Sequence, residues 1–137
     1  MTPTDVFHRA HGFVRAYDLR YVDCFAIDGV LELPFAPAPL PKQVRGREAI
    51  RALLAPRYAA AQASGRRLTD YRNLRIHETH DPHVIVAEFD AVGVPRGPGV
   101  EPYTLSFIHV VEVVDDHITM QRDYFDSLVM AERLRVS

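Results

Sequence analysis

Cysteine is almost absent from this chain of 137 residues, since Cys24 stands alone and no intrachain disulfide can form. Also missing are an N-terminal secretory signal and any apolar run near the ~20 residues that a membrane span needs. We therefore expect a soluble, cytoplasmic protein that does not bind membranes. A net charge of −2 gives no electrostatic reason to expect a nucleic-acid partner.

What is present is the composition of one globular domain, residues 1–137, with 47% hydrophobic and 25% charged residues. Apolar residues at helical spacing predict a helix over residues 4–17 that begins at an N-cap Thr4. On its wheel we assign His8 and His11 to the polar face. A short helix follows, with Asp18 as its N-cap.

A proline-rich segment separates two helical regions. We interpret Asp28-Gly29 as a turn, residues 30–33 as a short strand and residues 34–41 as an extended loop. The next helix begins near Arg47, and Pro56 should kink it or end its first part.

The second half predicts an antiparallel meander. Strands are expected over residues 68–79, 83–92, 103–114 and 118–125, with a Gly/Pro loop over residues 94–102. Helices followed by a meander indicate an α+β fold.

This order resembles the nuclear transport factor 2-like superfamily, and within it the SnoaL-like proteins. The resemblance covers residues 4–128 and rests on three segments: residues 28–35, residues 44–50 and residues 122–128. It implies a cone in which the N-terminal helices pack over a curved antiparallel sheet and enclose a pocket for a small apolar organic ligand. Independently of the resemblance, Ile108 and Val110 alternate with the pocket-facing positions and would lie exposed as an apolar patch, so we predict a homodimer through the outer face of the sheet.

The resemblance further implies sites. Steroid isomerases of this superfamily need a base and two oxyanion donors where this chain has Leu33, Ala10 and His109, so we predict negligible steroid isomerase activity. In phenazine-biosynthesis A/B and related proteins an acidic residue of the last strand is the acid/base, and Asp123 matches it.

The face that Asp123 occupies depends on one turn. A two-residue turn at Asp115-Asp116 would place Asp123 opposite to His109, whereas a three-residue loop with a bulge would place both on the pocket face. We prefer the three-residue loop, because Phe107, Gln121 and Phe125 then share that face.

In that arrangement Asp123 is the candidate acid/base, His109 its partner, and Glu88 a second acid if it points inward. The candidate pocket residues are Tyr17, Tyr21, Phe35, Tyr58, Phe107, Gln121 and Phe125. Each has a structural alternative: Asp123 in a surface ion pair, His109 as a satisfied core residue, Glu88 facing solvent, and the aromatics as core.

Two functions follow. The first is a cofactor-independent isomerase, cyclase or dehydratase that acts on an apolar carbonyl substrate, because the substrate's own carbonyl can accept the electrons. The second is a non-catalytic ligand-binding or dimerisation domain of the same fold. His77, His80 and His83 straddle the Asp81-Pro82 turn at a spacing that matches no zinc motif, so we expect no metal site.

Overall fold

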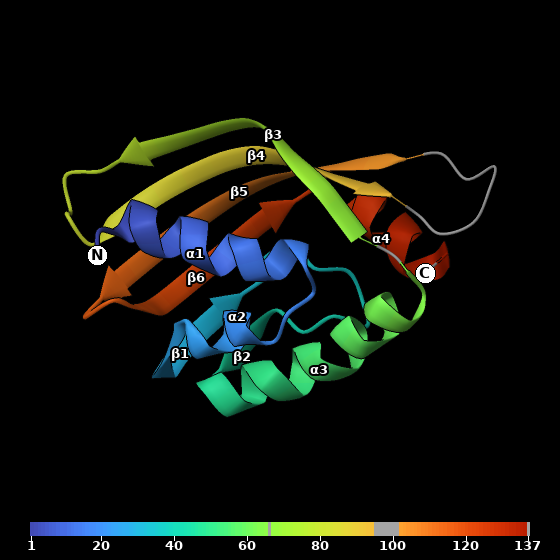
Figure 1. Ribbon diagram of the computed structural model, residues 1–137, viewed down its shortest axis with the longest axis horizontal. Coiled ribbons are helices and arrows are strands. Elements are labelled where there is room, and N and C mark those ends of the chain that lie inside the picture. Colours follow the sequence, from blue (N-terminus) through green and yellow to red (C-terminus); the bar gives the residue numbers. More distant parts are fainter. Residues whose placement is uncertain (66, 95–101, 137) are drawn as a thin grey trace.

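The computed structural model describes residues 1–65, 67–94 and 102–136 (Figure 1). Within these ranges the chain forms four helices and six strands. The helices are α1 (Pro3–Arg15), α2 (Arg20–Asp23), α3 (Arg47–Ala63) and α4 (Ser127–Val136). The strands are β1 (Phe25–Glu32), β2 (Gln43–Arg45), β3 (Arg67–Glu78), β4 (Val84–Val94), β5 (Tyr103–Val114) and β6 (His117–Phe125). The α+β prediction is confirmed, and most of the predicted loop over residues 94–102 lies outside the described residues.

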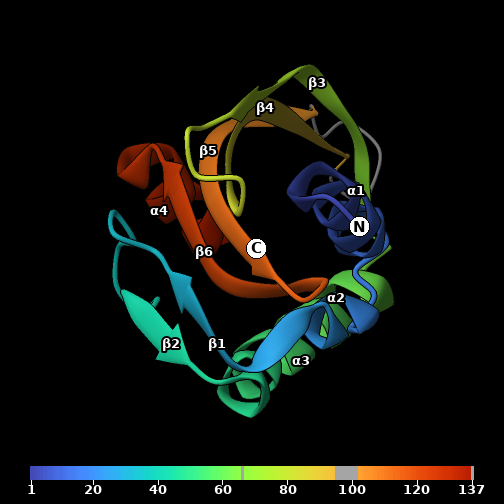
Figure 2. The same cartoon turned by 90° about the vertical axis from the view of Figure 1, so that its left-hand side faces the viewer.

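All the strands of the described chain belong to one curved sheet, in the order β2-β1-β6-β5-β4-β3. The strands from β3 to β6 form the predicted antiparallel meander. The sheet is not wholly antiparallel, however, because β1 runs parallel to β6. Seen end-on, the sheet curls around α1, which lies on its concave side, while α4 lies on the convex side of β5 and β6 (Figure 2).

The first helix begins two residues earlier than predicted. Thr2, not Thr4, is the N-cap: its hydroxyl accepts a hydrogen bond from Asp5 N, and the Asp5 carboxylate accepts one from Thr2 N. The buried face contains Val6, Phe7 and Ala10, as the apolar spacing requires. This face rests on the concave side of the sheet and closes one side of the interior.

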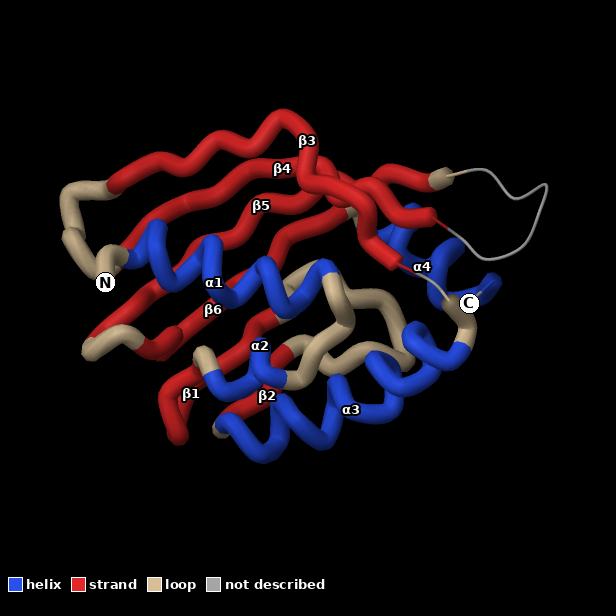
Figure 3. Tube along the Cα trace, viewed as in Figure 1, coloured by secondary structure: helices blue, strands red, loops and turns tan. Residues whose placement is uncertain are grey.

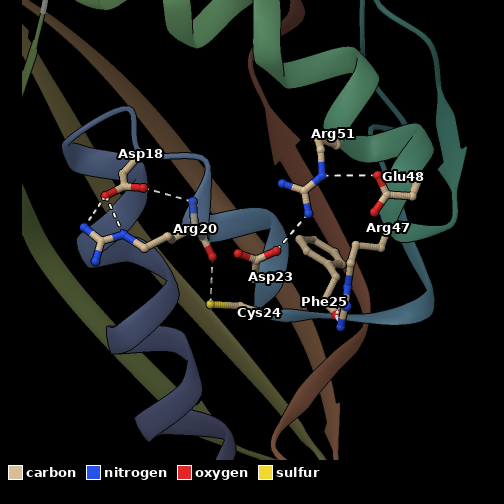
Figure 4. Close-up of polar contacts among 8 residues, drawn as sticks. All are labelled: Asp18, Arg20, Asp23, Cys24, Phe25, Arg47, Glu48 and Arg51. Atoms are coloured by element: carbon tan, nitrogen blue, oxygen red, sulfur yellow. Dashed lines mark hydrogen bonds and ion pairs between the residues drawn. The ribbon is translucent and has the colours of Figure 1, made fainter.

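Arginines of α3 tie this helix to the first strand and to α2 (Figure 4). Arg47 donates from Nε to the carbonyl oxygen of Phe25 at 2.9 Å, where β1 begins. Arg51 bridges Asp23 of α2 at 2.8 Å and Glu48 one turn back at 3.2 Å. The helix continues through Pro56, so the alternative that this proline ends its first part is wrong.

Asp28-Gly29 is not a turn, because β1 runs through it. A Cβ at Gly29 would lie 2.8 Å from the carbonyl oxygen of Ile118, so only glycine allows β1 to approach β6 this closely. The strand pairing is irregular between Phe25 and Val30, where glycine weakens the local preference for a strand.

The segment between β1 and β2 is the predicted loop, and Figure 3 shows it with neither helix nor strand. It folds over the domain far enough for Leu40 to contact the interior. No helix of the described residues has the length and apolarity to cross a membrane.

Candidate functional site

A cavity of about 270 Å³ lies between the concave face of the sheet and the helices. Most of its wall is apolar and comes from α1, α3, the loop between β1 and β2, and the strands β3 to β5. Its polar side chains include His109 of β5 and Gln121 and Asp123 of β6. Five of the seven predicted pocket residues line it: Tyr17, Tyr21, Tyr58, Phe107 and Gln121.

Asp123 reaches the cavity through a hairpin that differs from the predicted one. Val114 pairs with His117, so the turn has two residues, and Asp115 and Asp116 have φ values of 51° and 63° as a type I′ turn requires. That turn alone would place Asp123 on the outer face. The prediction of a three-residue loop is therefore wrong.

A bulge in β6 reverses which of its alternating side chains face the interior. Val113 pairs with Ile118, but Glu112 pairs with Met120, so Thr119 is an extra residue on β6. The Thr119 hydroxyl donates to the carbonyl oxygen of Glu112 at 3.2 Å and lies 2.6 Å from its carboxylate. Beyond the bulge His109 is paired with Asp123, and both side chains face inward, as predicted.

The two inward groups form a close pair. His109 Nε2 lies 3.2 Å from Asp123 Oδ1, and the two side chains are 5% and 15% exposed. The atoms are within ion-pair distance but are not aligned for a hydrogen bond, because neither ring nitrogen of His109 has a hydrogen-bond partner among the described residues. Asp123 Oδ1 instead accepts a hydrogen bond of 2.9 Å from the side-chain amide of Gln121.

Burial changes the charge states of this pair. Loss of hydration raises the pKa of Asp123 to about 7, and the hydrogen bond from Gln121 only partly opposes that rise. Burial also lowers the pKa of His109 to about 3, so its imidazole is neutral near pH 7. Asp123 can therefore give or take a proton near neutral pH beside an uncharged histidine.

His11 also lines the cavity, although its polarity predicted an exposed position. Its side chain is buried, its ring stacks on Phe7, and its Nδ1 lies 2.7 Å from the Tyr71 hydroxyl. The assignment of His11 to the polar helix face is wrong because this residue comes four positions after Phe7 and shares its face. The four-residue spacing from Phe7 is the sequence signal that indicates a buried His11.

Two predicted site residues lie elsewhere. Glu88 is on the outer face of β4, where its Oε2 is 2.7 Å from His77 Nε2, because inward positions of that strand are held by Ala87 and Phe89. Phe35 is 56% exposed and packs edge-on against Tyr124. Both line a second hollow, outside the cavity.

Phe125 points inward but is not part of the cavity wall. It is buried, packs edge-on against Phe107, and lines the second hollow instead. Of the three histidines near the turn between β3 and β4, His77 contacts Glu88 and His83 lies 3.2 Å from the Val113 carbonyl oxygen. In the described part of the chain no three His, Cys, Asp or Glu residues are grouped as metal ligands.

This chain is similar to known proteins in sequence as well as in fold. The SnoaL-like domain profile matches residues 8–121. An uncharacterized PhzA/B-like protein of Pseudomonas aeruginosa, PA3332, is 32% identical over 116 residues, which are 83% of this chain and 76% of that protein.

Solved structures agree on the fold. A Bacillus subtilis protein superposes with a TM-score of 0.78 and 25% identity, covering 98% of this chain and 94% of its own. A nuclear transport factor 2-like protein of Anabaena variabilis superposes with a TM-score of 0.65 and 17% identity, covering 91% and 90%. The matched domain profile and the PhzA/B-like relative show that this chain belongs to the SnoaL-like domain family, and the curved sheet is that of the nuclear transport factor 2-like fold.

Proposed function

We propose that this protein is a cofactor-independent enzyme that moves a proton on a small ring compound bearing a carbonyl group. The observation that carries the proposal is the Asp123–His109 pair at the cavity, 3.2 Å apart and 15% and 5% exposed. A carboxyl group whose pKa is near 7 is suited to general acid/base catalysis at neutral pH.

The proposed step needs no group beyond the substrate and Asp123. The Asp123 carboxylate removes a proton from the carbon next to the carbonyl, and the electrons of that C–H bond move toward the carbonyl oxygen. The resulting carboxylic acid then returns the proton to another carbon, or to an oxygen that leaves as water. The first outcome is an isomerisation and the second a dehydration. Attack of the enolate carbon on a second carbonyl closes a ring instead, and Asp123 then gives its proton to the alkoxide that forms.

The size of the cavity limits the substrate. Its volume of about 270 Å³ is just below the roughly 300–1,000 Å³ that ligand pockets span. One or two fused rings fit this space. The aromatic wall formed by Tyr17, Tyr58 and Phe107 suits flat ring faces.

A simple ketone tests the proposal. 2-Tetralone has two fused rings and acidic hydrogens next to its carbonyl, so the protein should speed their exchange in D₂O, as followed by ¹H NMR. Asp123→Asn keeps the shape but removes the base, and it should lower the protein-catalysed rate by at least ~10²-fold. Glu88→Gln, on the outer face, is the matched control and should stay within about twofold of the wild type.

Two results would sink the catalytic proposal. One is binding of 2-tetralone by the wild type with exchange no faster than in buffer. The other is an Asp123→Asn variant that exchanges as fast as the wild type. Either result would favour the ligand-binding domain.

A further inference from the structure

Unpartnered polar atoms gather on the wall of the cavity. Among the described residues five buried side-chain atoms lack a hydrogen-bond partner, and four of them belong to His11, His109 and Gln121. These three residues are only 4%, 4% and 1% exposed, and all three line the cavity. Each such atom costs roughly 1–3 kcal/mol of stability. A ligand with polar atoms at matching places would recover part of that cost.

His11 is held more firmly than the other two. Its ring stacks on Phe7 at 4.2 Å between centroids and meets Phe89 edge-on at 5.6 Å. The Tyr71 hydroxyl fixes Nδ1 at 2.7 Å, which leaves Nε2 as the atom without a partner. The His109 ring is 5.1 Å away, so His11 lies beside the acid/base pair rather than apart from it.

The hydrogen-bond network determines the tautomer of His11. Burial lowers the pKa of His11 well below 6.5, with His109 and Arg15 adding to the effect, so the ring is neutral and carries one N–H. Burial also raises the pKa of Tyr71, which keeps its phenolic proton. If His11 Nδ1 donated to Tyr71, both the phenolic hydrogen and His11 Nε2 would lack a partner among the described residues. Donation from Tyr71 to Nδ1 leaves only the Nε2–H of His11 without one, so the subsite proposed below takes this tautomer.

We propose that His11 and Tyr71 form an oxygen-binding subsite, in which the Nε2–H of His11 donates to a carbonyl oxygen of the bound ligand. The subsite takes a neutral cyclic ketone or quinone. A carboxylate is disfavoured, because a neutral imidazole cannot balance its charge in such an apolar wall. This inference concerns binding and stands whether or not Asp123 transfers a proton.

A pair of ligands that differ by one oxygen isolates the contact. 2-Tetralone carries the ketone and tetralin lacks it, and NMR titration gives a Kd for each. His11→Phe keeps an aromatic ring on Phe7 but removes the donor. The ratio of the tetralin Kd to the 2-tetralone Kd should therefore fall about 10-fold in this variant relative to the wild type.

Two further variants separate hydrogen bonding from shape. His11→Gln places an amide near the position of Nε2 and should keep the ratio within about threefold of the wild type. Val14→Ala changes the same helix and the same cavity wall without a polar group. It should shift both dissociation constants together and leave their ratio unchanged.

The tautomer gives a test that needs no variant. In protein labelled with ¹⁵N-histidine, the ligand-free His11 should show a protonated Nε2 and a bare Nδ1, and 2-tetralone should shift the Nε2 resonance. A proton on Nδ1, or an unchanged ligand ratio in folded His11→Phe, would overturn the subsite. Failure of deuterium exchange alone would refute the catalytic proposal and leave these two measurements standing.

Discussion

Two histidine–carboxylate pairs lie on opposite faces of the same sheet. On the outer face His77 and Glu88 are 2.7 Å apart, hydrogen-bonded, and 53% and 45% exposed. On the inner face His109 and Asp123 are 3.2 Å apart, unaligned, and 5% and 15% exposed. The shorter and better aligned pair is the one in contact with water.

Burial, more than residue type or distance, gives the inner pair its chemistry. Water screens the outer pair, so its attraction is weak. The inner pair has lost its hydration, which raises the pKa of Asp123 and lowers that of His109. A single extra residue, Thr119, determines which face Asp123 occupies.

Deleting Thr119 should therefore have a larger effect than any single substitution in either pair. Without the bulge residue, every side chain from Met120 to Phe125 moves to the other face, and Gln121, Asp123 and Phe125 leave the interior. Loss of Phe125 from the core alone costs roughly 3–5 kcal/mol, a large part of the stability of a small domain. Circular dichroism should show loss of cooperative unfolding.

The matched control keeps the bulge and removes only its hydroxyl. Thr119→Ala should lower the free energy of unfolding by about 1 kcal/mol, the size of a typical hydrogen bond. A deletion variant that unfolds cooperatively within about 1 kcal/mol of the wild type would show that the bulge does not fix the register.

The sequence predicts the meander well because its strands have strong local patterns. The predicted bounds of β5 are those observed, and β3, β4 and β6 differ by one or two residues at their ends. The inward position of Asp123 was also predicted, but by the wrong turn. Asp115-Asp116 has no glycine to indicate a type I′ turn, and nothing in the sequence marks Thr119 as a bulge.

The sequence did not predict the positions of His11, α4 and Glu88, each for a physical reason. His11 was assigned by its polarity, whereas its position on the helix buries it. The helix α4 was not predicted, although Asp126 accepts hydrogen bonds from Leu128 N and Val129 N as a helix N-cap does. The sequence pattern does not indicate α4 because Leu128 is 80% exposed and the apolar residues of this helix form no single stripe. Glu88 could not be placed, since strand parity depends on a register that the sequence does not fix.

Stability as a function of pH should separate the inner pair from the outer one. The folded-state pKa of Asp123 is raised, so the protonated carboxyl favours folding at low pH, and that contribution is lost as the pH rises from about 4 to about 7. Asp123→Asn has no such loss. The free energy of unfolding of the variant minus that of the wild type should therefore increase as the pH rises from about 4 to about 7, by no more than about 4 kcal/mol.

Urea denaturation of both proteins at intervals between pH 4 and pH 8 measures this difference. The sign is the critical result, because a normal surface aspartate would give no such trend. A difference that stays flat, or that falls as the pH rises, would contradict a desolvated Asp123.

The outer face also carries apolar residues, and we propose that it forms a homodimer interface. Ile108 is 44% exposed in the middle of β5, and Phe35 is 56% exposed nearby. Light scattering at micromolar concentration should give twice the chain mass of 15.5 kDa. Ile108→Glu should weaken association at least about 10-fold, since it places a charge in the interface. A wild type that is monomeric under these conditions would refute the interface.

The smallest effect is expected at the outer pair itself. A double-mutant cycle with His77→Ala and Glu88→Ala should give a coupling free energy of about 0.2–1 kcal/mol, as exposed ion pairs do. High salt should reduce it further, because charges in contact with water are screened. None of the three variants should change deuterium exchange into 2-tetralone by more than about twofold, since neither side chain contacts the cavity. A coupling above about 2 kcal/mol, or an exchange rate that follows Glu88, would mean that exposure does not separate the two pairs.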